Sequence, residues 1–74
     1  MIVDKRPELT DELIELYCDW RTRCEEVRAN YERFSDAPRA DRVLAFAAFE
    51  AALDREESAA EAYAAHMRRI AIAA

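Results

Sequence analysis

The chain has 74 residues, contains no glycine, and carries 16 acidic against 11 basic residues, for a net charge of −5. A chain of this length forms one domain at most and buries only roughly 60% of its unfolded surface. Disulfides, a metal or self-association usually supply the missing stability. The negative charge argues against nucleic acid as a partner, since phosphate binding needs a basic surface.

Residues 1–9 are expected to form a short irregular N-terminal arm, and this arm lacks the apolar segment of a secretory signal. The longest apolar run, Val43–Phe49, has seven residues, far fewer than the ~20 needed to span a bilayer. We therefore expect a cytoplasmic protein without a membrane partner. The excess of arginine over lysine and the abundance of alanine indicate a bacterial or phage source.

The helical hairpin is expected to occupy residues 10–74, with its first helix over about residues 11–34. Thr10 is the expected N-cap, because its hydroxyl can accept a hydrogen bond from a free backbone N–H. Apolar side chains recur along this helix at alternating steps of four and three residues, the spacing that places them on one face. They are Leu13, Tyr17, Trp20, Cys24, Val27, Tyr31 and Phe34.

A single break, Ser35-Asp36-Ala37-Pro38, precedes the second helix, which is expected over about residues 37–70. Its predicted seam has the same spacing and consists of Phe46, Phe49, Leu53, Glu56, Ala60, Tyr63, Met67 and Ile70. Two such helices predict an all-α fold, a two-helix antiparallel hairpin of the coiled-coil kind, with more than about two-thirds of the chain helical.

Folding about Asp36 would place Trp20 opposite Leu53 and Tyr17 opposite Glu56. The second helix would then extend past the start of the first, since it is the longer of the two. The sequence thus predicts an apolar overhang of Tyr63, Met67 and Ile70, covered by Ile2 and Val3 of the arm or by a partner chain.

The apolar stripe of each helix is wider than one seam requires, a feature typical of helices in bundles. We therefore expect two hairpins to dimerise into a four-helix bundle. The predicted oligomer contacts are Ile14, Leu16, Cys18, Leu44, Ala48 and Ala51.

Acidic side chains also recur at helical spacing on both helices. They are Glu50, Asp54, Glu57 and Glu61 on the second helix, and Glu12, Glu15 and Asp19 on the first. Three interpretations stay open: a docking face for a basic protein, a carboxylate metal site, or a solvated surface. Arg21 is expected to approach Glu50 across the hairpin and to help select the antiparallel pairing.

No combination of residues indicates catalysis, and we predict a protein that is not an enzyme and has no cofactor. The only histidine, His66, lacks the Glu-x-x-His motif of di-iron bundles. Cys18 and Cys24 lie six residues apart on one helix, about 9 Å along its axis, which is too far for a disulfide. We assign no catalytic and no metal-binding residue.

The leading functional hypothesis is a small homo-oligomeric protein–protein interaction module. It would act as a regulator, an adaptor, an antitoxin-like inhibitor or an assembly factor, with a basic protein as a candidate partner. One alternative is a carboxylate-metal bundle of the ferritin-like kind. A second alternative, a nucleic-acid-associated factor, is disfavoured by the negative charge.

Overall fold

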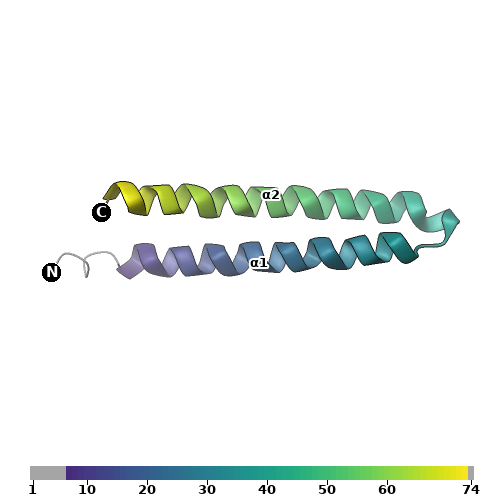
Figure 1. Ribbon diagram of the computed structural model, residues 1–74, viewed down its shortest axis with the longest axis horizontal. Coiled ribbons are helices and arrows are strands. Elements are labelled where there is room, and N and C mark those ends of the chain that lie inside the picture. Colours follow the sequence, from purple (N-terminus) through teal and green to yellow (C-terminus); the bar gives the residue numbers. More distant parts are fainter. Residues whose placement is uncertain (1–6, 74) are drawn as a thin grey trace.

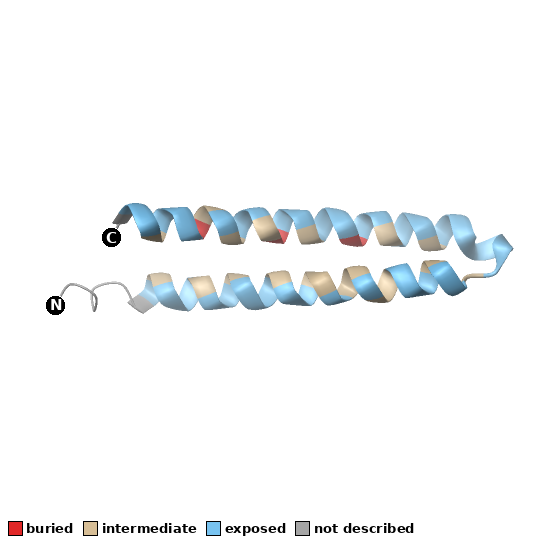
Figure 2. Cartoon of the chain, in the orientation of Figure 1, coloured by how far each residue is buried: buried red, intermediate tan, exposed pale blue. Residues whose placement is uncertain are grey.

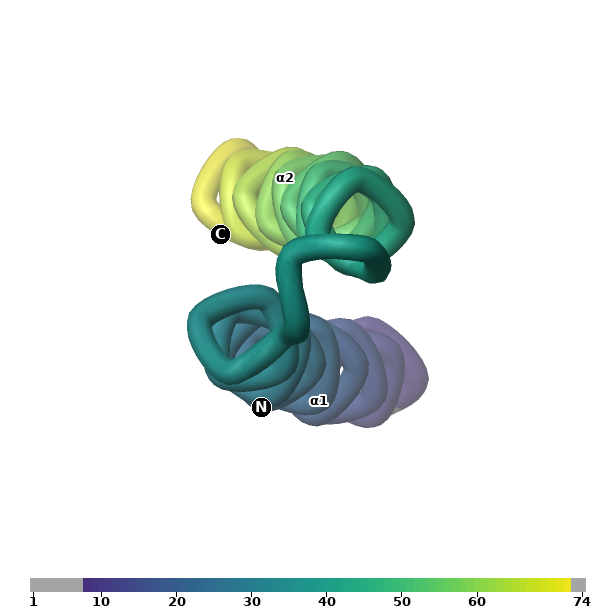
Figure 3. The backbone as a smooth tube through the Cα atoms, turned by 90° about the vertical axis from the view of Figure 1, so that its right-hand side faces the viewer, coloured from purple at the N-terminus to yellow at the C-terminus, as the bar shows by residue number. Residues whose placement is uncertain are grey.

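The computed structural model describes residues 7–73. Two long helices, α1 (Pro7–Asp36) and α2 (Arg42–Ala73), are joined by a short 3-10 helix, η2 (Arg39–Asp41). The long helices run antiparallel and side by side (Figure 1). Viewed end-on, they form a single layer of two helices closed by the turn (Figure 3). The predicted all-α hairpin is therefore confirmed.

Helix α1 has 30 residues and α2 has 32, well over two-thirds of the 74-residue chain, as predicted. Helix α1 is rich in glutamate, arginine and leucine, and α2 in alanine, glutamate and arginine, all of which are strong helix formers. Helix α1 begins at Pro7 rather than after a Thr10 cap. Proline suits this first position, because the N–H that it lacks would have no partner there. The other part of the predicted arm, residues 1–6, lies outside the described residues.

The turn is centred about three residues later than the sequence predicts. Helix α1 continues through Asp36, and Pro38 is extended, with φ −60° and ψ 156°. The residue before a proline is biased away from helical geometry, so α1 ends here. The backbone N–H of Asp41 donates to the carbonyl of Pro38 at 2.9 Å, and Arg42 Nη2 donates to the carbonyl of Ala37 at 3.2 Å. No described residue has a positive φ, so this turn needs no glycine.

Moving the turn by three residues moves the pairing of the two helices by about six. Trp20 was expected opposite Leu53, but its ring stacks on Tyr63 and its indole reaches Glu56. Tyr17 likewise contacts Tyr63 rather than Glu56. Near the turn, Phe34 contacts Phe46 and Phe49. The predicted pairing is therefore wrong by almost two helical turns.

The observed seam on α2 differs from the predicted one in every second residue. Phe49, Glu56, Tyr63 and Ile70 are part-buried, as expected, but the positions between them belong to Ala45, Ala52, Ala59 and His66. The row predicted at those positions, Phe46, Leu53, Ala60 and Met67, lies one residue further round the helix, and Phe46, Leu53 and Met67 are exposed.

Alanine occupies these seam positions because bulky α1 side chains lie opposite them. Glu56 and Tyr63, the two residues that Trp20 contacts, lie on either side of Ala59. This register places Ala59, which is buried, opposite Trp20. Ala52 is 0% exposed, and the same register places it opposite Val27. Large side chains against small ones let the two helices approach closely.

The predicted apolar overhang does not exist at Tyr63, which packs between the helices against Tyr17 and Trp20. The two helices differ by two residues in length, and their ends lie nearly level (Figure 1). Ile70 is half-buried, and Met67 is exposed on the side of α2. The proposed cover, Ile2 and Val3, lies outside the described residues.

The hairpin is a thin rod with a small core. Its Cα radius of gyration is 17.0 Å, against about 11 Å for a compact domain of the same length. Among the residues whose burial the structure describes, those that are buried are Ala52, Ala59 and His66, all on the side of α2 that faces α1 (Figure 2). As far as the described residues extend, neither helix holds an apolar stretch long enough to cross a membrane.

Candidate interaction surface

A hydrogen bond inside the seam joins the middle of α1 to the middle of α2. The indole Nε1–H of Trp20 donates to Glu56 Oε2 at 2.8 Å, and the Trp20 ring stacks on Tyr63 with 5.8 Å between the ring centroids. The sequence predicts Tyr17 opposite Glu56, whereas in the structure Trp20 is the hydrogen-bond partner of Glu56. Glu56 is thus a structural acceptor within the seam.

His66 connects the far end of α2 to the first turn of α1. It is 2% exposed, and its Nε2 lies 2.8 Å from the carbonyl oxygen of Leu9. A carbonyl oxygen only accepts, so Nε2 carries the proton. Nδ1 is then free to accept from Arg69 Nη1, at 3.5 Å. Glu12 Oε1 lies 3.6 Å from Nε2, and these contacts give His66 a structural role.

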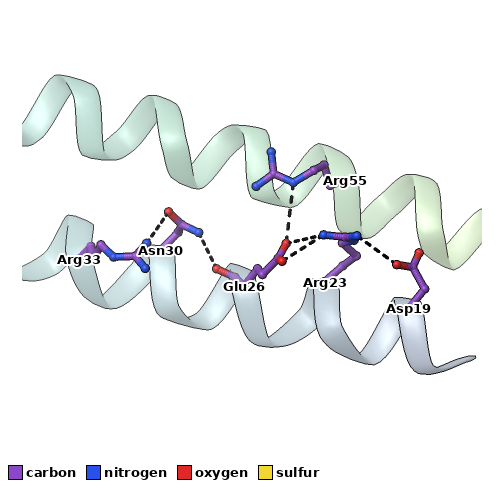
Figure 4. A network of polar contacts seen from close by, with 6 residues as sticks. All are labelled: Asp19, Arg23, Glu26, Asn30, Arg33 and Arg55. Carbon is purple, nitrogen blue, oxygen red and sulfur yellow. Dashed lines mark hydrogen bonds and ion pairs between the residues drawn. The ribbon is translucent and has the colours of Figure 1, made fainter.

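One edge of the hairpin is polar, and its charges are paired within the chain (Figure 4). On this polar edge, Arg23 bridges Asp19 at 3.1 Å and Glu26 at 2.9 Å, and its hydrogen bond to Glu26 raises the pKa of the Arg23 guanidinium. Arg55 of α2 reaches the same Glu26 carboxylate at 3.8 Å. Asp19, Arg23, Glu26 and Arg55 are therefore paired along and across the helices, while Arg33 Nη1 donates to the neutral Asn30 Oδ1 at 2.9 Å.

The opposite edge is apolar. Tyr17 and Tyr31 lie on α1 at this edge, and each contacts a seam aromatic of α2, Tyr63 and Phe49 respectively. Phe46 lies on the α2 side of the same edge and contacts Phe34. Residues at seven-residue spacing continue both rows. We call this surface the aromatic edge: Tyr17, Cys24 and Tyr31 of α1 with Phe46, Leu53, Ala60 and Met67 of α2.

Most of the exposed large apolar side chains lie on this side of the hairpin. Nine such side chains are described, and five of them belong to the aromatic edge, including Tyr31 at 54% and Met67 at 46% exposure. Ile14 and Val43 lie beside it, because each stands three residues before an edge residue. Seven of the nine thus lie on one side of the hairpin, and this clustering makes that side a candidate interaction surface.

Four charged residues border the aromatic edge, and we call them the rim: Arg21 and Arg28 on α1, and Glu50 and Glu57 on α2. Each stands four residues after one edge residue and three before the next, and so lies beside the edge. Arg21 Nη1 donates to the Tyr17 hydroxyl at 3.1 Å, which raises the pKa of Arg21. The predicted approach of Arg21 to Glu50 does not occur.

The acidic residues predicted to form one docking face are separated by the structure. Asp19 lies on the polar edge with Arg23, and Glu12 lies beside His66. On α2, Glu50 and Glu57 border the aromatic edge instead, while Asp54 and Glu61 point away from the seam at exposed positions. Glu15 is also exposed. Within residues 7–73, no three His, Cys, Asp or Glu side chains are grouped closely enough to hold a metal ion.

The residues predicted as oligomer contacts do not form one surface either. Ile14 lies beside the aromatic edge, but Leu16 is half-buried in the seam. Cys18 is exposed two residues beyond Leu16, on the outside of α1. Leu44, Ala48 and Ala51 are exposed on α2 and do not belong to the rows of the aromatic edge. The exposed apolar face is therefore a different set of residues from the one expected.

Two surface depressions lie away from the aromatic edge. The larger, about 610 Å³, lies at the turn beside Glu32, Asp36 and Pro38. The other, about 310 Å³, lies on the polar edge beside Arg55 and Ser58. Neither gathers the exposed large apolar side chains, so the aromatic edge is the better candidate for a binding surface.

The aromatic edge was not predicted from the sequence, because its α2 residues have the spacing expected of seam residues. Phe46, Leu53 and Met67 have the spacing and the size of core residues, so the sequence predicts them in the hairpin interior. The sequence does contain the row that forms the seam instead: Ala45, Ala52 and Ala59, each one residue before a member of the row that begins at Phe46.

Comparisons with protein-family models, with curated proteins and with solved structures gave no match to this chain.

Proposed function

We propose that this protein is a non-enzymatic, self-associating helical module that acts through protein–protein contacts. The observation that carries the proposal is the distribution of apolar side chains. The buried hydrophobic residues of the described chain are two alanines, Ala52 and Ala59, whereas five large apolar residues of the aromatic edge are exposed. A two-helix layer of this size gains too little from its own core and is usually stabilised by association.

The spacing of the apolar residues supports the same conclusion. Helix α2 carries two seam rows plus a third, bulky row on one side, whereas α1 carries one apolar seam row and beside it the row of Tyr17, Cys24 and Tyr31. An apolar stripe that extends beyond the seam is typical of helices in a bundle rather than in an isolated pair. These outer rows lie on the same side of both helices, since Tyr31 and Phe46 each reach across to a seam aromatic of the other helix. A partner that covers this side would complete the core.

Sedimentation equilibrium of three proteins tests the proposal: the unaltered chain, Leu53→Glu and Leu44→Glu. Both leucines are exposed on α2, but only Leu53 belongs to the aromatic edge. The unaltered chain and Leu44→Glu should form oligomers, whereas Leu53→Glu should shift strongly toward monomer. A folded, monomeric unaltered chain, or equal behaviour of the two variants, would contradict the proposal.

A further inference from the structure

We propose that the aromatic edge binds a second copy of this chain about a two-fold axis parallel to the rod, so that both turns lie at the same end. This inference rests on the proposed self-association and specifies its surface and geometry. In this dimer, α1 of each copy covers α2 of the other, and the four helices alternate in direction around a shared core.

The size of the apolar face fits a second copy. The helices have 30 and 32 residues, and the hairpin measures 15 Å in its second dimension. At 1.5 Å per residue the face is about 45 Å long and about 700 Å² in projected area. A stable interface buries about 800 Å² on each partner. A second hairpin of equal length covers this face along its whole extent.

The charges of the rim favour one orientation of the second copy over the other. Arg21 and Arg28 lie on α1, while Glu50 and Glu57 lie on α2. The seam register places Arg21 level with Glu57 and Arg28 level with Glu50, because Trp20 contacts Glu56 and Tyr63. With the turns at the same end, Arg21 of one copy meets Glu57 of the other, and Arg28 meets Glu50.

The other two-fold arrangement brings like charges together. If the turns lay at opposite ends, α1 would cover α1 and α2 would cover α2, and arginine would face arginine while glutamate faced glutamate. Like charges brought together across an interface disfavour that arrangement. Single exposed ion pairs contribute little to affinity, so the aromatic edge supplies the binding and the rim supplies the orientation.

Within the described residues, three of the four rim charges are unpaired in one hairpin, as are exposed charges elsewhere such as Glu15 and Glu61. On the polar edge, Asp19, Arg23, Glu26 and Arg55 neutralise one another within one hairpin. The side chains of Arg28, Glu50 and Glu57, by contrast, make no hydrogen bond or ion pair with the residues that the structure describes. Opposite charges on the two helices thus remain available beside the apolar face.

A spin-label distance measurement tests this geometry. Ala40 lies in η2 at the turn and is exposed, so one nitroxide can be placed at Ala40→Cys in a Cys18→Ser, Cys24→Ala background. Turns at the same end of a bundle with helices about 10 Å apart should give a label separation below about 30 Å. Turns at opposite ends should give about 45 Å or more.

The outcomes separate this inference from the proposed function. A dimer with the short distance supports both. A dimer with only the long distance overturns the geometry and leaves self-association intact. The absence of any intermolecular distance, together with a monomeric mass of the unaltered chain, overturns both.

Charge reversal at the rim gives a second, independent test. Arg21→Glu with Arg28→Glu should weaken the dimer at least about tenfold at low salt, and less at high salt, because like charges then face each other. Adding Glu50→Arg and Glu57→Arg to the same chain should restore it. The matched control is Arg33→Glu with Arg68→Glu, two exposed positions outside the rim. A dimer unaffected by the first pair, or weakened equally by the control pair, would contradict the proposed orientation.

Discussion

The indole of Trp20 and the carboxylate of Glu56 form a 2.8 Å hydrogen bond across the middle of the hairpin. This bond fixes the relative position of the two helices, since an apolar seam alone tolerates sliding by a heptad more readily than a polar pair does. It also explains an acidic residue in a seam position, because a part-buried carboxylate needs a donor.

The Trp20 side chain should therefore contribute to stability in two separable ways. We expect Trp20→Ala to lower the free energy of unfolding by about 3–5 kcal/mol, as large-to-small changes do in cores. Trp20→Phe keeps a ring against Tyr63 but leaves Glu56 without its donor, so it should cost about 1–3 kcal/mol. Glu56→Gln, which retains an acceptor oxygen, is the control. Chemical denaturation measures all three, and equal losses for Trp20→Phe and Glu56→Gln would show that the hydrogen bond is unimportant.

His66 should hold the open end of the hairpin together. His66→Ala removes the hydrogen bond to the Leu9 carbonyl and leaves a space at a buried position. We expect faster amide hydrogen exchange in the first turns of α1 and the last turns of α2, with little change near the turn. A uniform increase in exchange along both helices would contradict this local role.

Two glutamates of α2 that lie four residues apart, Glu57 and Glu61, should affect self-association differently when their charge is reversed. Glu57 belongs to the rim, whereas Glu61 is exposed outside it. Glu57→Lys should therefore weaken self-association, and Glu61→Lys should leave it nearly unchanged. Both should stay helical, since each also relieves the repulsion between like charges four residues apart. Sedimentation at low salt compares the two variants, and a larger effect of Glu61→Lys would show that the rim is misplaced.

The two cysteines should also differ. Cys24 is half-buried in the aromatic edge, and Cys18 is exposed on the outside of α1. We expect Cys18→Ser to change stability by less than about 1 kcal/mol. Cys24→Ser places a hydroxyl where the second copy packs, so it should weaken association and lower the melting temperature more. Equal effects of the two substitutions, measured at one protein concentration, would contradict this placement.

Much of the fold was predictable because helix formation and apolar spacing are local. The alternating steps of four and three from Leu13 to Phe34 identify α1, and the sequence Ala37-Pro38 stops it. The antiparallel hairpin follows from one short break between two apolar stripes. Four α2 seam residues were also correct, namely Phe49, Glu56, Tyr63 and Ile70.

The pairing and the candidate surface were not predictable in the same way. The pairing depends on the centre of the turn, and the sequence predicts a break at Ser35 and Asp36, although both belong to α1. The bulky residues at positions 46, 53 and 67 have the size of core residues. The seam positions opposite Trp20 and Val27, however, have room only for alanine. Which of two adjacent apolar rows enters a seam is decided by the shapes across it.

The central claim is that this hairpin is completed by association through the aromatic edge, and thermal unfolding at a series of protein concentrations tests it most directly. If folding and association are linked, a hundredfold increase in concentration should raise the melting temperature by about 5–10 °C. Leu53→Glu should lose this dependence, because it places a charge at the centre of the edge. A sharp melting transition of the unaltered chain at one temperature for all concentrations would show a self-sufficient monomer and contradict the claim.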